Sequence, residues 1–270
     1  MKYIKDFIGF LKVLVEQRYI ILQIAKRDFQ NKYLASYLGL FWAFAQPSVS
    51  MLVMWFVVTF GFKAGPVQLG MPFGIWFICG YVPWIFLSDA ILGGGNSLLE
   101  YSYLIKKIYF RPSIIPVIKL ITALIIHGFF LLLACSFAIG YGFYPTLYWL
   151  QLPYYLLCAI VLILGISWFT SAVTVFVRDI GQFLSVAMQI IFWMTPIIWQ
   201  KTMLEGHMKF IAYLNPFYYI VEGYRESFFS QMWFFEHVRL TIYFWAVTGC
   251  IFVIGALVFS RLKPHFADVL

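Results

Sequence analysis

The chain has 270 residues, of which 63% are hydrophobic, 21% aromatic and 11% charged, and its formal net charge is +8. Soluble domains contain roughly 25% charged residues, so this composition excludes a soluble protein and predicts an all-α integral membrane protein. A membrane span needs about 20 largely apolar residues, which leaves room for six spans in a single transmembrane domain, residues 1–270, and for no soluble catalytic domain. The positive charge is expected on cytoplasmic loops, and no nucleic-acid partner is predicted.

The first predicted element is a helix within residues 1–36. This segment holds seven basic residues, and apolar side chains such as Leu14, Ile21 and Ile24 recur near helical spacing. The pattern predicts an amphipathic helix, which lies either on an anionic membrane leaflet or against a partner protein. The segment has no short apolar core followed by a cleavage site of small residues, so a cleaved signal peptide is not expected.

Six apolar runs follow, and we predict that each crosses the membrane. Cytoplasmic loops collect Lys and Arg, so the orientation follows from the 19 basic residues. With the N-terminus inside, 14 of them face the cytoplasm and five face outside, which places both termini in the cytoplasm. The predicted spans are Leu38–Phe62, Phe73–Leu92, Ile114–Gly140, Pro153–Val177, Gln182–Trp199 and Leu240–Ser260.

Two internal loops join these spans on the cytoplasmic side. We expect Gly93–Gly95 to end the second span and to open the loop of residues 96–111. That loop is either a short helix that docks a soluble partner or a solvated, positively charged connection. The other internal loop contains the adjacent residues Arg178 and Asp179, which serve either a tight turn or the same docking surface.

Residues 214–234 are too charged for a span and too aromatic for a solvated loop. The segment contains Glu222, Arg225 and Glu226, and each charge at the centre of a spanning helix costs about 2.5 to 3.5 kcal/mol. We therefore predict an external re-entrant helical hairpin, which is tolerated where protein or water surrounds it. Glu222 and Arg225 are three positions apart, so they either neutralise each other as an ion pair or act on a passing substrate.

The sequence contains no recognisable catalytic chemistry. It has no Gly-x-x-x-x-Gly-Lys-Ser/Thr motif for a P-loop ATP site. Its four histidines and four cysteines are scattered without metal-site spacing. We therefore predict no catalytic residue, no metal and no cofactor bound by this chain.

Four stretches of the chain carry a recognisable order of motifs. They are Tyr33–Trp42 with Pro47, Leu104–Phe110 with Pro116, Val177–Ile180 followed by Thr195–Ile197, and Asn215–Arg225. Together they resemble the permease subunit of ATP-binding-cassette exporters for polysaccharides attached to a polyprenyl diphosphate, the family that includes O-antigen and wall teichoic acid exporters. One departure lies at Phe110-Arg111-Pro112, where the family usually places proline directly after phenylalanine.

The resemblance implies a homodimer of six-span subunits in the bacterial cytoplasmic membrane, bound to two copies of a separate P-loop ATPase that holds ATP and Mg²⁺. It implies that residues 1–36 lie at the cytoplasmic interface, that residues 96–111 couple to the ATPase, and that residues 214–234 close the external side. The implied gate and translocation path include Tyr218, Tyr219, Glu222, Tyr224 and Arg225. The implied coupling surface includes Glu100, Tyr101, Tyr103, Lys106, Lys107, Arg178 and Asp179.

The chemistry of the implied substrate fits a chain rich in Trp, Tyr and basic residues. Sugar rings stack on aromatic side chains, while their hydroxyl groups need a few placed polar partners. The anionic lipid diphosphate is expected to meet Arg27, Lys32 and Arg111 at the cytoplasmic mouth. Two rival functions stay open: a drug or lipid exporter permease of the same fold, and a membrane enzyme that acts on polyprenyl-linked sugars. The scattered acids and histidines argue against the enzyme.

Overall fold

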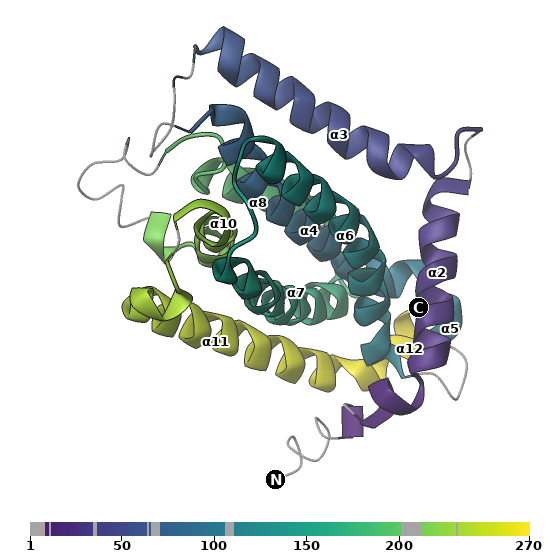
Figure 1. Cartoon of the computed structure of the whole chain (residues 1–270). Coiled ribbons are helices and arrows are strands. Elements are labelled where there is room, and N and C mark those ends of the chain that lie inside the picture. The colour runs from purple at the N-terminus through teal and green to yellow at the C-terminus, as the bar shows by residue number, and fades with distance from the viewer. Residues whose placement is uncertain are drawn as a thin grey trace.

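The computed structural model describes residues 9–10, 12–34, 37–63, 65, 71–105, 111–200, 203, 212–230 and 232–270 (Figure 1). The regular secondary structure among these residues is helical, and no strand occurs among them. The all-α class that the composition predicts is confirmed.

Five helical segments are long and apolar enough to cross a membrane. They correspond to five of the six predicted spans. Short 3-10 or π turns extend four of them beyond the α-helix proper. Their α-helices are α3 (Phe41–Phe56), α4 (Phe73–Glu100), α6 (Ile115–Gly140), α7 (Leu152–Thr174) and α11 (Val238–Leu262).

The sixth predicted span, Gln182–Trp199, corresponds to a shorter apolar helix, α8 (Ile180–Met194). Its 15 residues reach about 22 Å at 1.5 Å per residue, less than the roughly 30 Å hydrocarbon core. The helix ends because Thr195 has extended backbone angles, φ −92° and ψ 132°, and the residue before a proline, here Pro196, is disfavoured in the helical region.

The second span is longer than predicted, because α4 continues through Gly93–Gly95 to Glu100. These glycines were expected to end the helix, and that expectation is wrong. Two of them are packing positions instead: the space beside Gly94 is filled by Ser167 of α7, and a Cβ on Gly95 would lie 2.5 Å from the Cδ2 of Leu184 of α8. The first residues of the predicted loop 96–111 are therefore helical.

The centre of the molecule is formed by α4, α6 and α7, with α3 and α11 on opposite sides of this group (Figure 1). Burial follows this arrangement. In the most apolar 18-residue stretch of each span, 67% of the residues are buried for α4, against 17% for α3 and 22% for α11. The apolar outer faces of α3 and α11 are available for lipid or for another chain.

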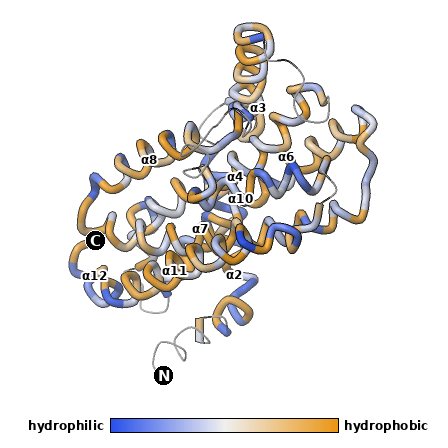
Figure 2. The backbone as a smooth tube through the Cα atoms, turned by 90° about the vertical axis from the view of Figure 1, so that its left-hand side faces the viewer, coloured by the Kyte–Doolittle hydropathy of each residue, from blue (hydrophilic) through white to orange (hydrophobic). Residues whose placement is uncertain are grey.

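The N-terminal part of the chain forms α2 (Arg18–Leu34), which packs against α6. Its buried side chains Ile21 and Ala25 meet Ile114 and Ile118, while Tyr19 on the other side is 72% exposed. Figure 2 shows hydrophilic stretches on α2 and around α12, whereas the long helices are mostly hydrophobic. Residues 1–8, 11, 35 and 36 of the predicted amphipathic segment lie outside the described residues.

The C-terminal helix α12 (Phe266–Val269) lies at the same end of the molecule as α2 and the short helix α5 (Ser102–Ile105) (Figure 1). Phe266 is buried in a cluster with Tyr101, Trp168 and Phe259, against which Ile105 also packs. The end of α4, the beginning of the predicted coupling segment and the C-terminus therefore share one apolar cluster.

Candidate functional site

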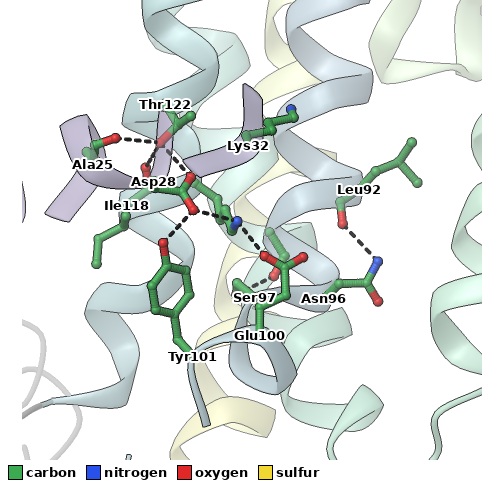
Figure 3. Close-up of polar contacts among 12 residues, drawn as sticks. Ala25, Asp28, Lys32, Leu92, Asn96, Ser97, Glu100, Tyr101, Ile118 and Thr122 are labelled. Atoms are coloured by element: carbon green, nitrogen blue, oxygen red, sulfur yellow. Dashed lines mark hydrogen bonds and ion pairs between the residues drawn. The ribbon is translucent and has the colours of Figure 1, made fainter. Parts of the chain in front are cut away.

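A buried polar network joins α2 to the ends of α4 and α6, and Asp28 is at its centre (Figure 3). The Asp28 carboxylate accepts hydrogen bonds from Lys119 Nζ at 2.8 Å, from Thr122 Oγ1 at 2.9 Å and from the Tyr101 hydroxyl. Lys119 Nζ also lies 2.5 Å from Glu100 Oε2. One acidic side chain of α2 therefore connects this helix to both α4 and α6 at the end of the bundle.

The electrostatics of this network favour an ionised Asp28. Burial acts to raise the pKa of its carboxyl, but the hydrogen bonds from Lys119 and Tyr101 and the positive charge of Lys119 outweigh it and hold the pKa below its usual value. Burial, together with the nearby Asp28 carboxylate, raises the pKa of the Tyr101 hydroxyl. The Tyr101 hydroxyl is therefore neutral at physiological pH and donates to a carboxylate.

A cavity of about 390 Å³ lies beside this network. Its wall combines carboxylates and amines with a few aromatic side chains, so it is polar. The lining residues are Asp28, Asn31, Lys32, Asp89, Gly93, Glu100, Tyr101, Tyr103, Lys119 and Thr122.

A second cavity, a groove of about 570 Å³, lies between α3 and α4. It is lined by Lys32, Trp42, Gln46, Pro47, Ser50, Tyr81, Trp84, Ile85, Ser88, Asp89, Leu92 and Ile126. Lys32 and Asp89 line both cavities, and Lys32 Nζ lies 2.6 Å from Asp89 Oδ1. An ion pair between α2 and α4 therefore marks the boundary between the polar cavity and the groove.

The groove combines aromatic rings with uncharged polar groups. On α3 the lining residues Trp42, Gln46 and Ser50 are four positions apart and so share one helix face. Tyr81 and Trp84 of α4 line the opposite wall. Such walls suit a ligand with alternating apolar faces and hydroxyl groups.

The charged aromatic segment begins with α10 (Pro216–Arg225), whose start is fixed by Asn215. Asn215 Oδ1 accepts from the Phe217 amide at 3.0 Å, and Asn215 Nδ2 donates to Thr195 Oγ1 at 2.7 Å. Pro216 occupies the first helical turn, where its missing N–H leaves no bond unmade. The predicted helix start at Asn215–Pro216 is therefore confirmed, and the same side chain connects α10 to the end of α8.

Arg225 is almost completely buried, with 3% of its side chain exposed. Its guanidinium donates to the carbonyl oxygens of Trp76 at 3.2 Å, Pro196 at 2.6 Å and Ile197 at 2.8 Å. It also lies 3.5 Å from the centre of the Trp76 ring and 3.4 Å from Glu222 Oε2. Arg225 thus connects α10, α4 and the segment after α8.

A comparison with known proteins identifies the family of this chain. The sequence profile described as ABC-2 type transporter matches residues 19–229. This chain belongs to the ABC-2 type transporter family. It is a transport subunit, and ATP hydrolysis belongs to a separate subunit of the transporter. The family that the sequence motifs indicate is confirmed.

Three curated relatives of this ABC-2 transporter subunit are O-antigen export system permease proteins named RfbA. Two from Klebsiella pneumoniae are 25% and 26% identical over 258 residues, which cover 93% of this chain and 95% of each relative. One from Myxococcus xanthus is 24% identical over 226 residues, which cover 83% of this chain and 85% of the relative. The similarity extends along nearly the whole length of both Klebsiella proteins.

Those predicted coupling residues of this ABC-2 subunit that the structure describes lie at one end of the molecule. Glu100 and Tyr101 join the Asp28 network, and Tyr103 lines the polar cavity. The exposed turn at Arg178–Asp179 is close to α4, because a Cβ on the following Gly181 would lie 2.6 Å from the Oδ1 of Asn96. Lys106 and Lys107 lie outside the described residues.

The three basic residues predicted to meet a lipid diphosphate are not gathered in one place. Lys32 lines both cavities. Arg111 Nη1 donates to the Gly9 carbonyl oxygen at 3.3 Å, and Arg27 is exposed on α2. Of the three, Lys32 alone lines the polar cavity and the groove.

The predicted gate tyrosines pack inside the bundle. Tyr219 shares hydrogen bonds of 3.0 Å with Tyr154 and Thr241, and Tyr224 lies 3.0 Å from Nε2 of His127. Tyr218 is also buried, with 3% exposed. Glu222 forms the ion pair with Arg225 that the spacing allows. These contacts fix α10 in the fold, and a role of its tyrosines in a translocation path stays a prediction.

Several functional candidates were not predicted from the sequence. Asp28 and Lys119 are 91 positions apart, so spacing gives no sign of their contact, although an acid on the buried face of a basic helix is itself a signal. The spacing of Trp42, Gln46 and Ser50 was a usable local signal for a polar aromatic face, whereas the opposite wall depends on how α3 and α4 pack.

Proposed function

We propose that this chain is the permease of a bacterial exporter that moves a polyprenyl-diphosphate-linked polysaccharide, such as O-antigen or teichoic acid, across the cytoplasmic membrane. The observation that carries the proposal is the match, over 93% of the chain, to permeases named for O-antigen export. The aromatic and polar groove between α3 and α4 supports it, because it offers the chemistry that glycans need.

The proposed assembly is a homodimer with two copies of a P-loop ATPase. The outer face of α3 supports this arrangement, because Leu52, Val53 and Phe56 are each more than half exposed. On α8, Phe183 and Trp193 are likewise 68% and 57% exposed. These apolar faces pack against a second copy and bound a path between the two permeases, with the remaining apolar surface facing membrane lipid.

The proposed topology has six spans with both termini in the cytoplasm, and α8 is the sixth, short span. Residues 214–234 form the external re-entrant hairpin, which is supported by the burial of α10 among α4, α7 and α11. A charged segment is tolerated at membrane depth when protein surrounds it. Residues 1–36 form the interface helix on the cytoplasmic side, supported by the packing of α2 across the end of α6.

Coupling to ATP hydrolysis occurs through the end of α4 and the turn at Arg178–Asp179. The Asp28 network supports this role, because it connects α2 to the residues that lead into the predicted coupling segment. A movement of Tyr101 imposed by the ATPase is transmitted to α2 through the Asp28 carboxylate. Rearrangement of α2 then changes access to the polar cavity and the groove.

The proposal is tested by deleting this gene in its source bacterium and labelling the surface polymer on intact and on permeabilised cells. We expect the polymer to disappear from the surface, to accumulate inside, and to return to the surface with the wild-type gene. When the wild-type permease gene is returned to a strain whose own ATPase carries alanine in place of the P-loop lysine, export should not be restored. Unchanged surface polymer in the deletion strain would overturn the proposal.

A biochemical measurement separates this function from its rivals. In the purified complex, the lipid-linked glycan should stimulate ATP hydrolysis, whereas small amphiphilic drugs should not. Stimulation by amphiphiles alone would point to a drug or lipid exporter permease. Sugar transfer by the permease without its ATPase would point to a membrane enzyme.

A further inference from the structure

We propose that Lys32, at the boundary of the two cavities, binds a phosphoryl group of the substrate, and that the groove between α3 and α4 holds the sugar units next to it. This assignment rests on the proposed function and deepens it by locating a substrate subsite. It is carried by the position of the Lys32–Asp89 ion pair, by its exposure, and by the side chains that line the groove.

The position of the ion pair suits a ligand with two chemically different parts. Lys32 and Asp89 are the two residues shared by the linings of the polar cavity and the groove. If the sugar units of a ligand lie in the groove, the group at the cytoplasmic end of that ligand therefore lies next to Lys32. In a polyprenyl-diphosphate-linked glycan, the sugar attached to the diphosphate is directly next to the anionic group.

Exposure distinguishes Lys32 from the other lysine that lines the polar cavity. The side chains of Lys32 and Asp89 are 39% and 31% exposed, whereas that of Lys119 is 11% exposed and lies between two carboxylates, 2.8 Å from Asp28 and 2.5 Å from Glu100. A partly exposed ion pair is weakly held because water screens it. Removing Lys119 from its partners would leave Asp28 buried without its cation. Lys32 is therefore the lysine that can exchange its carboxylate partner for a ligand.

The exchange replaces one oxyanion by another. Lys32 Nζ has three donors, one of which is 2.6 Å from Asp89 Oδ1. When a phosphoryl oxygen takes that place, Asp89 faces the polar cavity and is solvated there. Asp89 thus competes with the ligand for Lys32 and keeps the unoccupied site electrically balanced. Because of this competition, removing the charge of Lys32 should weaken binding of the ligand, whereas removing the charge of Asp89 should strengthen it.

The groove supplies the contacts for the sugar units. Trp42, Tyr81 and Trp84 present ring surfaces, and Gln46 and Ser50 present hydrogen-bonding groups. Its volume of about 570 Å³ lies within the range of roughly 300 to 1,000 Å³ that small-molecule sites occupy. Trp42 is 45% exposed, so its ring is accessible from the groove without unpacking the core.

The test measures binding to the complete complex of permease and ATPase in phosphatidylcholine nanodiscs. The probes are undecaprenyl diphosphate and the same lipid carrying one N-acetylglucosamine. We expect Lys32→Gln to weaken binding of both probes about tenfold, as for loss of one hydrogen bond to a charged group. We expect Asp89→Asn to strengthen it about two- to fivefold, because the competitor for Lys32 loses its charge.

Opposite signs are the decisive readout. An ion pair that only connects α2 to α4 would be broken by either substitution, so equal or parallel changes would overturn the proposal. The doubly neutral variant, Lys32→Gln with Asp89→Asn, should bind weakly because it lacks the cation. The matched control is Lys26→Gln, another exposed lysine of α2 that lines neither cavity, and its affinity should equal that of the wild type.

Two further arms identify the source of the phosphoryl group and the place of the sugar. Phosphatidylglycerol added to the nanodiscs should compete poorly; equal competition would assign Lys32 to bulk phospholipid and overturn the proposal. Trp42→Leu should weaken the sugar-bearing probe and leave undecaprenyl diphosphate unchanged. Phe137→Leu, a replacement of an exposed aromatic of α6 that lines neither cavity, is the control. Equal weakening of both probes by Trp42→Leu would overturn the sugar subsite.

The outcomes also separate this proposal from the proposed function. If the wild-type complex binds the sugar-bearing probe and Lys32→Gln binds it equally well, the subsite is overturned and the export function stands. If the wild-type complex binds neither probe, both are overturned.

Discussion

Gly80 of α4 leaves the space that the guanidinium of Arg225 fills. A Cβ on Gly80 would overlap three atoms of that guanidinium, which is held on its other sides by the carbonyl oxygens of Pro196 and Ile197. The sequence motif of α10 therefore depends on a glycine that lies 145 positions earlier in the chain. Arg225 therefore connects α10, α4 and the segment after α8.

Replacing Arg225 by alanine is expected to destabilise the protein by about 3 to 5 kcal/mol, because it leaves buried carbonyl groups without donors and Glu222 without this cation. The effect is measured by heating the purified permease in detergent and recording the fraction of the protein that stays monodisperse. Arg239→Ala is the control, since Arg239 is exposed. An unfolding midpoint equal to the wild type would contradict the connecting role.

The relation to Gly80 gives a sharper test. Gly80→Ala alone should lower the unfolding midpoint, because the new methyl group displaces the guanidinium from its carbonyl partners. In the Arg225→Ala background the same substitution should cost little, since the space is then empty. The two effects should therefore be strongly non-additive. Additive effects would show that Gly80 matters for another reason.

Replacing Asp28 by alanine is expected to loosen α2 from the end of α6. The substitution removes the acceptor for Lys119, Thr122 and Tyr101, so we expect a loss of about 2 to 4 kcal/mol in the docking of this helix. Hydrogen exchange of the α2 amides should become faster, and transport per ATP hydrolysed should fall. Lys26→Gln, an exposed change on the same helix, should leave both unchanged. Wild-type exchange in the Asp28→Ala variant would exclude the network as the connection.

The Asp28 network also predicts an acid sensitivity. The pKa of Asp28 is lower in the folded protein than its ordinary value of 3.8. A carboxyl with a depressed folded-state pKa stabilises the fold above its unfolded pKa and loses this contribution as pH falls through the folded value. The unfolding midpoint of the wild type should therefore fall below about pH 4 more steeply than that of Asp28→Asn. Asp268 is an exposed acid near the C-terminus, so the unfolding midpoint of Asp268→Asn should depend on pH as that of the wild type does. A wild-type pH dependence in Asp28→Asn as well would contradict the lowered pKa of Asp28.

The parts of this fold that the sequence predicts are those set by local pattern. Five apolar runs became long apolar helices because a run of about 20 such residues is stable in few other settings. The Glu222–Arg225 pair was predictable because residues three apart share a helix face. The start of α10 was predictable because asparagine followed by proline suits a helix N-terminus.

The parts that the sequence did not predict depend on contacts between distant segments. Gly93–Gly95 looked like the end of a helix, yet Gly94 and Gly95 lie where α7 and α8 pack closely against α4. Lys119 looked like one more positive charge at the cytoplasmic side, yet its partner Asp28 belongs to another helix. Charge counting treats every lysine as solvated, so it cannot find a base that is paired inside the protein.

Helices α7 and α11 approach each other closely at a pair of glycines, Gly165 and Gly255. A Cβ on Gly255 of α11 would overlap the carbonyl oxygen of Gly165, and a Cβ on Gly165 would lie 2.8 Å from the backbone Cα of Phe252. Backbone atoms cannot move aside as a flexible side chain can. Gly255→Ala should therefore push the helices apart and destabilise the protein by about 1 to 3 kcal/mol.

Gly249 on the same helix is the matched control, because a Cβ there meets no atom within 4 Å. Gly249→Ala should leave the unfolding midpoint unchanged or raise it slightly, since alanine favours a helix over glycine by about 1 kcal/mol. The two variants carry the same added methyl group on one helix, so their difference reports the contact with α7 alone. Equal midpoints would show that α11 is held by its other contacts, whereas a lower midpoint for Gly255→Ala assigns the close approach to this glycine pair, as small residues commonly provide between membrane helices.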